Sequence, residues 1–285
     1  LVTPFTTCSA RLPVYAIIIA LVIPDNRVFG FLNMQGMTLM LLYLLGFGMA
    51  IFSAYVLNKI LKIKGKTYFV VEMPNYKLPM FKNVAINVIE KTKAFVFGAG
   101  KIILAISVIL WFLASYGPGK NFNDAEAIVK ERTKNAPLTS IELEDAIASQ
   151  KVENSYIGIM GKTIEPAISP LGYDWKIGIA IISSFAAREV FVGTLATIYS
   201  VGGSDNETTI KNKMQQEINP VTGAKVFNFA SGVSLLLFYA FALQCASTLA
   251  ITKKETNSWK WPLGQLIFMS GLAYIVALIA YQILK

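Results

Sequence analysis

The sequence contains no histidine and only two cysteines, Cys8 and Cys245. Two isolated cysteines provide neither a zinc-finger spacing nor a disulfide framework. Without histidine, no serine or cysteine has the base partner that commonly activates a nucleophile. We therefore expect no structural zinc module, no hydrolysis of the serine or cysteine type, and no enzyme activity.

Charge is also scarce. Charged residues make up 15% of the 285 residues and hydrophobic residues 54%, whereas ordinary soluble domains are about 25% charged. This composition is typical of a membrane protein. The net charge of +9 comes largely from lysines in loops between apolar runs, so we expect the lipid bilayer as partner and no nucleic acid. The chain starts at Leu1 without a signal-like segment, so we expect it to be part of a longer polypeptide.

Long apolar runs dominate the sequence. A helix that crosses the hydrocarbon core of a bilayer needs about 20 mainly apolar residues. Four runs have this length: Met37 to Leu57, Ala94 to Leu113, Phe227 to Ile251 and Leu263 to Leu284. The second run contains Lys101 near its start, where a lysine can extend to the interface. These runs predict an all-α fold, a polytopic transmembrane helical bundle.

Two further apolar segments are interrupted. Leu12 to Ile23 is bounded by Pro13 and Pro24, and Ile177 to Val201 carries Arg188 and Glu189 at its centre. We expect each of these segments to contain a broken or re-entrant helix.

The polar stretches between the runs indicate orientation. Lys59 to Lys93 holds eight lysines against two glutamates, which predicts a cytoplasmic loop. Gly117 to Ser155 holds five basic and seven acidic residues, which suits the opposite side. The stretch from Gly202 to Lys225 is balanced at three and three and indicates no side. Trp259 and Trp261 are expected at interfacial depth.

The two interrupted segments share a short repeat. Thr6 to Arg11 aligns with Ser183 to Arg188, with two hydroxyls, one variable position, a small residue, alanine and arginine. Repeats built around broken helices place the binding site of many transporters near the bilayer midplane. We therefore treat the two segments as equivalent elements of one architecture.

The ionisable residues of these segments need a protein environment. A charge inside the bilayer costs several kcal/mol unless it is paired or hydrated, so Arg11, Arg188 and Glu189 are expected to face a protein interior or a cavity. Two interpretations remain open: the charges line a path, or they pair with nearby carbonyls and only hold helices together. The small residues Gly193 and Thr194 would permit close helix approach.

Few residues in the apolar segments can bind a metal ion. Thiolate and carboxylate groups bind divalent transition-metal ions, and without histidine the candidates reduce to Cys8, Cys245 and Glu189. A lone cysteine in an apolar helix is usually just a small hydrophobic residue. Cys8 is favoured over Cys245, because it lies near Arg11 and Pro13, where irregular backbone would offer free carbonyls and hydroxyls.

Four stretches, taken together and in order, resemble the ferrous iron transport protein B family. CSARLPVY at Cys8–Tyr15 is similar to its first gate motif, and FAAREVFVGTL at Phe185–Leu195 to its second. PNYKLP at Pro74–Pro79 and LQCASTLA at Leu243–Ala250, which leads into Lys253-Lys254-Glu255-Thr256, fit the same family. The resemblance covers essentially the whole chain.

This resemblance implies ferrous iron uptake across a bacterial inner membrane by a multi-pass protein. Cys8, Cys245 and Glu189 become the suspected iron ligands, because such groups can replace part of the hydration shell of an ion and still release it. The resemblance also implies a permeation path along the two gate segments. Its residues are Ser9, Arg11, Pro13, Ser183, Ser184, Arg188, Gly193 and Thr194.

The family also has an N-terminal GTPase domain that binds GTP and Mg²⁺, and this sequence lacks it. Gly65-Lys66-Thr67 and Gly161-Lys162-Thr163 do not complete a P-loop, because Ile60 and Tyr156 stand where its first glycine belongs. We expect no bound cofactor and no GTP hydrolysis by this chain itself. The resemblance implies the GTPase domain, small accessory proteins and a homo-oligomer as partners.

The sequence predicts six consecutive regions. They are a first gate segment (1–35), two transmembrane helices (36–115) joined by a cytoplasmic loop (59–93), a polar, extracytoplasmic loop (116–171), a second gate segment (172–201), a polar loop (202–226) and two C-terminal transmembrane helices (227–285). Two other functions stay open: a gate-type transporter of a nucleoside or other polar solute, and a scaffold whose buried charges are purely structural.

Overall fold

The computed structural model describes most of the chain. The described residues are 2–6, 8–28, 32–61, 80–97, 101–132, 143, 147, 150–185, 188, 190–200, 214, 225–243 and 245–285. The motif at Pro74–Pro79, nearly all of the predicted loop 202–226, and the predicted ligand Glu189 lie outside these residues.

Among the described residues, three segments are long and apolar enough to cross a membrane. They are Met34–Lys59 within helix α2 (Met34–Leu61), Phe229–Thr256, and Lys260–Leu284, which is helix α14. The middle segment consists of α12 (Phe229–Phe241) and α13 (Ala246–Thr256), with a break between them. The prediction of an all-α, multi-pass membrane bundle is confirmed. The only strands among the described residues are the two-residue pair β1 (Arg27–Val28) and β2 (Leu32–Asn33).

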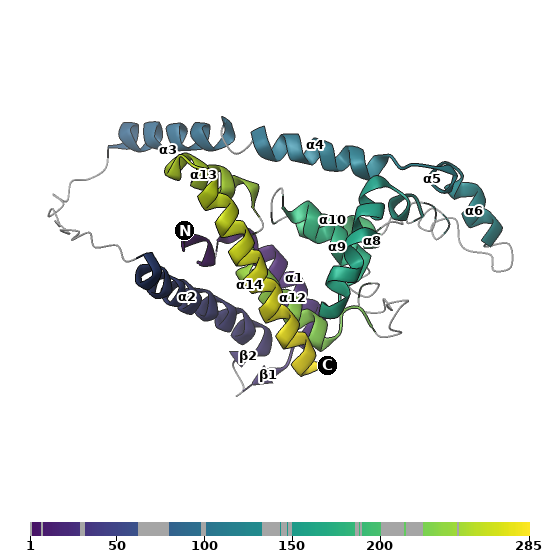
Figure 1. Ribbon diagram of the computed structural model, residues 1–285, viewed down its shortest axis with the longest axis horizontal. Coiled ribbons are helices and arrows are strands. Elements are labelled where there is room, and N and C mark those ends of the chain that lie inside the picture. The colour runs from purple at the N-terminus through teal and green to yellow at the C-terminus, as the bar shows by residue number, and fades with distance from the viewer. Residues whose placement is uncertain are drawn as a thin grey trace.

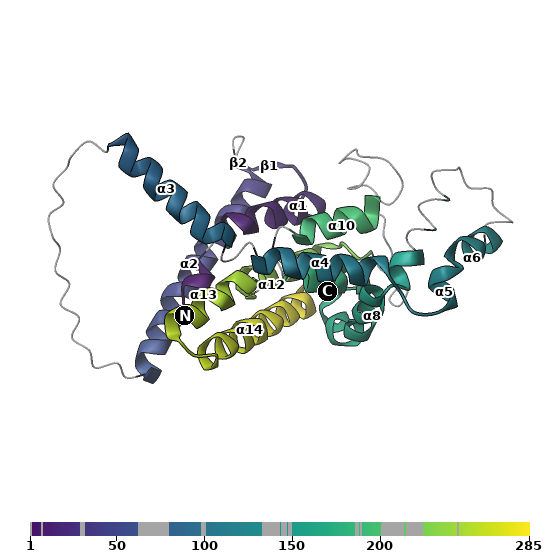
Figure 2. The ribbon, with the colours of Figure 1, turned by 90° about the horizontal axis from the view of Figure 1, so that it is seen from above.

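Helices α12 and α1 (Leu12–Val22) lie at the centre of the core. Both are short, and both are surrounded by other elements in the two ribbon views (Figures 1 and 2). Pro13 lies in the first turn of α1, where its missing N–H has no intrahelical partner to lose. Gly232 of α12 faces Val22, and a Cβ atom at this position would overlap the Val22 side chain. This glycine allows α1 and α12 to approach closely.

The second interrupted segment is broken, as predicted. Helix α9 (Trp175–Ser184) begins where the Asp174 side chain accepts a hydrogen bond from the Ile177 N–H at 2.9 Å. Helix α10 (Val190–Ser200) follows after Phe185 and Arg188, which are both outside helix. The first interrupted segment likewise has two short 3₁₀ turns, η1 (Thr3–Phe5) and η2 (Ser9–Arg11), before α1.

Two of the predicted loops contain helix. The predicted cytoplasmic loop, residues 59–93, is described at its C-terminal end, where it forms helix α3 (Phe81–Phe95). Helix α4 (Lys101–Ser115) comes next in the chain. The run predicted as one helix from Ala94 to Leu113 is therefore divided between α3 and α4. The loop prediction rested on charge, whereas the apolar residues of α3 recur at intervals of three and four, which is a helical period.

The predicted extracytoplasmic loop is also partly helical. It contains α5 (Lys120–Asn123), α6 (Ala125–Arg132) and α8 (Tyr156–Ile168), followed by the 3₁₀ turn η4 (Ser169–Leu171). Helix α8 packs on α9, because Gly161 leaves space for the Ile179 side chain and the Trp175 carbonyl. Gly161 thus lies in a helix-packing contact inside α8.

Candidate permeation site

The break between α12 and α13 is the starting point of the site. Helix α12 ends at Phe241, and both Ala242 and Cys245 have extended backbone. A helix end leaves its last carbonyls without intrahelical donors, and such groups need other partners inside a membrane. We call this region, Tyr239 to Ala246 together with Phe185 and Arg188, the junction.

Arg188 supplies these partners. Its Nη1 donates to the Tyr239 carbonyl at 3.0 Å, and its Nη2 donates to the Ala242 carbonyl at 2.5 Å. The side chain is buried, with only 4% of the residue exposed. A cation at a helix C-terminus is also favoured by the helix dipole. Arg188, from the break between α9 and α10, thus closes the break between α12 and α13.

Further contacts join the same two broken helices. The Ala246 N–H at the start of α13 donates to the Phe185 carbonyl at the end of α9, at 3.0 Å. The Tyr239 hydroxyl donates to Ser184 Oγ at 3.1 Å, and the Tyr239 ring lies 4.7 Å from the ring of Phe191, centroid to centroid. The two breaks therefore meet at one place.

The first gate segment reaches this place as well. The ring of Phe5 packs edge-on against Phe241, with ring centroids 6.4 Å apart. Arg11, only 1% exposed, donates through Nη2 to the Pro4 carbonyl at 2.7 Å and through Nη1 to the Phe5 carbonyl at 3.3 Å. The Nε atom of Arg11 has no hydrogen-bond partner among the described residues. The prediction that both arginines face the protein interior is confirmed.

The two arginines are close enough to act on one another electrostatically, and both act on the buried Tyr15. In the part of the chain that the structure describes, neither forms a salt bridge with a carboxylate. Backbone carbonyls instead accept the hydrogen bonds that both guanidinium groups donate. Because Arg188 donates to carbonyls at the end of α12, its buried charge holds two broken helices together.

The cysteines border the junction without forming a metal cluster. Cys8 is exposed, immediately before η2, and Cys245 is half-buried at the start of α13, where its Sγ lies 2.7 Å from Ser247 Oγ. Among the described residues, no three cysteine, aspartate or glutamate side chains come together. Cys245 thus lies in the junction and Cys8 just before η2, while the third predicted ligand, Glu189, lies outside the described residues.

The remaining predicted path residues separate into two groups. Ser9 and Pro13 are exposed at the start of the first gate segment. Ser183 and Thr194 form a hydrogen bond of 2.8 Å between their hydroxyl groups, and with Gly193 they line a cavity of about 420 Å³. Ser184 lies on the opposite side, where it contacts Tyr239.

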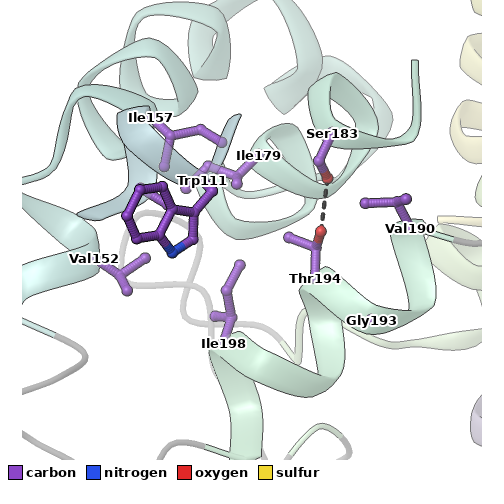
Figure 3. Close-up of a pocket in the computed structure, with 10 residues that line it drawn as sticks. Trp111, Val152, Ile157, Ile179, Ser183, Val190, Gly193, Thr194 and Ile198 are labelled. Carbon is purple, nitrogen blue, oxygen red and sulfur yellow. Dashed lines mark hydrogen bonds between the residues drawn. The ribbon is translucent and has the colours of Figure 1, made fainter. Parts of the chain in front are cut away.

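This cavity is mainly apolar. Its lining residues come from α4, α8, α9 and α10 and from Val152; they are Trp111, Ala114, Val152, Ile157, Ile179, Ser183, Val190, Gly193, Thr194 and Ile198. Trp111, Val152 and Ile157 gather at one side and Val190 lies at the other, with the two hydroxyls facing one another between α9 and α10 (Figure 3). Such a lining offers few hydrogen-bond partners to a polar solute.

Sequence reasoning missed several residues of the site. Tyr239 carried a weak signal, because it is a hydroxyl-bearing residue within a long apolar run. The carbonyl of Ala242 carried none, because any residue has a carbonyl and neither glycine nor proline marks the break. Trp111 lies far from both gate motifs in the sequence and reaches the cavity only through the packing of α4 on α8.

Two broken apolar helices that meet at their breaks, within a multi-pass bundle, define a gate-type membrane protein. A family model, Gate, described as "Nucleoside recognition", matches residues 96–259, and a second, described as "Ferrous iron transport protein B C terminus", matches residues 39–91. The chain therefore belongs to the Gate family. Within it, the second match and the relatives described next identify the chain with the C-terminal membrane portion of ferrous iron transport protein B.

The similar proteins are Fe(2+) transporters. The chain is 41% identical over 283 residues to Fe(2+) transporter FeoB of Leptospira interrogans, which covers 99% of this chain and 38% of the relative. It is 40% identical over 287 residues to FeoB of Leptospira biflexa, covering 100% of this chain and 38% of the relative. A Porphyromonas gingivalis fusion of Fe(2+) transport protein A with FeoB is 30% identical over 298 residues, covering 99% of this chain and 34% of the relative.

The chain thus spans little more than a third of the length of these relatives. No solved structure is significantly similar to it.

Proposed function

We propose that this chain is the membrane permease portion of a ferrous iron transporter and that Fe²⁺ passes through the junction. The observation that carries the proposal is the meeting of both gate segments at a helix break that ends in Cys245. Similarity to Fe(2+) transporters over nearly the whole chain supports the choice of iron. Cys8, Cys245 and Glu189 are the proposed iron ligands.

The chemistry of the junction suits a labile cation site. A helix break offers backbone carbonyls, and Cys245 adds a thiol beside the Ser247 hydroxyl. Thiolate ligands favour transition metals over magnesium or calcium, and carbonyl and hydroxyl oxygens bind more weakly. A mixed site of this kind can replace part of the hydration shell and still release the ion.

Arg188 gives this site a gate. Its guanidinium group donates to the Tyr239 and Ala242 carbonyls, which are the oxygens that a passing cation would use. Arg188 therefore acts as a tethered cation that competes with Fe²⁺ for these carbonyls. Iron coordination by the Ala242 carbonyl requires the guanidinium group to withdraw first, because two cations cannot share that site without strong repulsion.

The complete protein supplies what this chain lacks. We propose that an N-terminal GTPase domain, which binds GTP and Mg²⁺, drives or gates the junction, and that the chain itself is not an enzyme and holds no cofactor. The Porphyromonas gingivalis relative, fused to Fe(2+) transport protein A, supports a small accessory protein as partner. We further propose assembly as a homo-oligomer in the bacterial inner membrane.

Nucleoside transport is the second candidate, because the matching Gate model is described as "Nucleoside recognition". The cavity beside α10 has room for a small solute, but the polar groups of its described lining side chains are two hydroxyls, of Ser183 and Thr194, and the indole N–H of Trp111. A buried nucleoside needs more hydrogen-bond partners than one N–H and two hydroxyls that already bond to one another. This geometry favours the iron proposal.

Uptake of ferrous iron tests the proposal. Cells expressing the complete protein are compared, under reducing conditions and at matched membrane abundance, with variants Cys8→Ser, Cys245→Ser and Glu189→Gln. We expect each variant to lose most of its iron uptake and Cys245→Ser to lose the most, about tenfold or more, which corresponds to at least about 1.4 kcal/mol of lost ion stabilisation. Uridine uptake in the same cells tests the second candidate.

The matched control is Ser231→Ala in α12, a buried hydroxyl of the same core outside the junction. It should change stability but not the ratio of iron uptake to abundance. Normal iron uptake in all three ligand variants would show that the ligand assignment is wrong. Loss of abundance in step with uptake would instead favour a scaffold role.

A further inference from the structure

In the described part of the chain, helix α3 exposes large apolar side chains. Phe81 is 93% exposed, Val88 57% and Ile89 62%, although all three are large apolar residues. In Figure 2 α3 projects away from the central helices and runs across, not along, the direction of α14. An apolar surface of this kind on a helix needs another environment to bury it.

The residues of α3 divide into two faces. With 100° of rotation per residue, Phe81, Val84, Ala85, Val88 and Ile89 fall on one side of the helix. The opposite side carries the polar residues Asn83, Asn87 and Glu90, with Ile86 as the one large apolar residue outside the apolar face. Helix α3 is thus amphipathic along its length.

The position of the charges indicates the partner. Lys82 and Lys93 are eleven residues apart, about three helical turns, so both lie along the same border between the apolar and polar faces. Glu90 lies away from the apolar face. Lysines at this border can lay their stems on hydrocarbon and place their ammonium groups at phosphates, while an acidic residue points to water. The pattern fits an anionic lipid surface better than an apolar protein groove.

The position of α3 in the fold supports the same partner. It lies in the sequence between the membrane helix α2 and the apolar helix α4, whose first residue, Lys101, follows Phe95 closely. The turn between α13 and α14 lies at the same end of the molecule (Figures 1 and 2). That turn has Lys253 over the ring of Trp259, with 4.1 Å from Nζ to the ring centroid, an arrangement suited to a membrane interface.

We propose that α3 lies in the plane of the membrane surface and binds anionic phospholipid. Its apolar face enters the boundary between headgroups and acyl chains, and Lys82 and Lys93 contact headgroup phosphates. Basic side chains near a membrane surface attract anionic lipid electrostatically. This assignment does not depend on the iron path or on the identity of the transported solute.

Depth measurements on the complete protein test the proposal. A nitroxide is attached at Val88→Cys or at Asn87→Cys in a Cys8→Ser, Cys245→Ser background, and the protein is placed in vesicles of phosphatidylcholine with or without phosphatidylglycerol. We expect the label at 88 to be relaxed by oxygen, which partitions into lipid, and protected from a water-soluble nickel chelate. The label at 87 should show the reverse. Adding Lys82→Glu and Lys93→Glu should remove most of the nickel protection at position 88 in the anionic vesicles.

Three results would overturn the proposal. The first is equal exposure of both positions to nickel in anionic vesicles. The second is protection at position 88 that is independent of both anionic lipid and the two lysines. The third is protection of the label at 88 from both oxygen and nickel that disappears when the GTPase domain is deleted. This result would mean that the GTPase domain, not lipid, covers the apolar face. A second measurement uses Asn87→Trp or Val88→Trp in the protein that keeps both cysteines. Quenching of the tryptophan fluorescence by brominated lipid then reports the depth of each position.

Discussion

The two buried arginines end the two copies of the sequence repeat, but their partners differ. Arg11 donates to Pro4 and Phe5, which precede it by seven and six residues. Arg188 donates to Tyr239 and Ala242, which lie 51 and 54 residues away on another broken helix. The same motif therefore stabilises a local turn in the first copy and joins two distant breaks in the second. A shared sequence pattern predicts burial here, but it does not predict what the buried group holds together.

The largest effect is expected from Arg188→Met. The variant leaves the carbonyls of Tyr239 and Ala242 without their donors, and each hydrogen bond to a charged group contributes roughly 1.5–3 kcal/mol. We expect a loss of about 3–5 kcal/mol in the free energy of unfolding, measured on the complete protein in detergent. Arg188→Lys, which keeps the charge but not the forked donor geometry, should be intermediate. Unchanged stability in Arg188→Met would show that the contact does not join the helices.

A smaller effect is expected from Arg11→Met. This variant also removes two hydrogen bonds, but it relieves the burial of a guanidinium group whose Nε has no partner among the described residues. The acceptors belong to a short segment that can rearrange locally, unlike two packed helices. We expect a loss of about 1–2 kcal/mol, less than half the loss in Arg188→Met. Equal losses in the two variants would remove the distinction between a local and a long-range role.

The same contrast explains what the sequence could predict. The break near Arg188 was predictable, because a charge interrupts an apolar run and needs an interior environment. The break at Ala242 to Cys245 was not, and Phe227 to Ile251 was predicted as one helix. No glycine or proline marks it, and its carbonyls are satisfied by Arg188, a residue distant in sequence. Tertiary contacts overrode a local pattern that favours continuous helix.

The bundle itself was more predictable than the site. The runs at Met37 to Leu57 and Leu263 to Leu284 correspond closely to α2 and α14. Their length and apolar composition are properties of the local sequence, so they can be predicted without knowledge of tertiary contacts. Helix α3 was missed, since counting lysines hides the helical period of its apolar residues. The cavity could not be predicted, because its walls come from four separate helices and Val152.

The gate segments also differ in how tightly they pack, and two glycines test this. A Cβ at Gly232 would overlap Val22 of α1, whereas a Cβ at Gly193 of α10 meets nothing within 4 Å. We expect Gly232→Ala to lose about 1–3 kcal/mol by overpacking. Gly193→Ala should be neutral or gain up to about 1 kcal/mol from helix propensity. Thermal unfolding of both variants measures the difference; similar midpoints would mean that α1 and α12 can separate without cost.

The smallest effect is expected at the hydroxyl pair of the second gate segment. Ser183 and Thr194 share a hydrogen bond of 2.8 Å, but Ser183 also donates to the Ala180 carbonyl at 3.0 Å, so the Ser183 hydroxyl keeps an alternative partner. A double-mutant cycle of Ser183→Ala and Thr194→Val should give a coupling energy of about 0.5–1 kcal/mol, well below the cost of Arg188→Met. A coupling above this range would mean that the pair holds α9 to α10 more strongly than one ordinary hydrogen bond does. Because the hydroxyls line an apolar cavity and the arginine lies in the junction, the ranking of these variants separates the contribution of the cavity to stability from that of the junction.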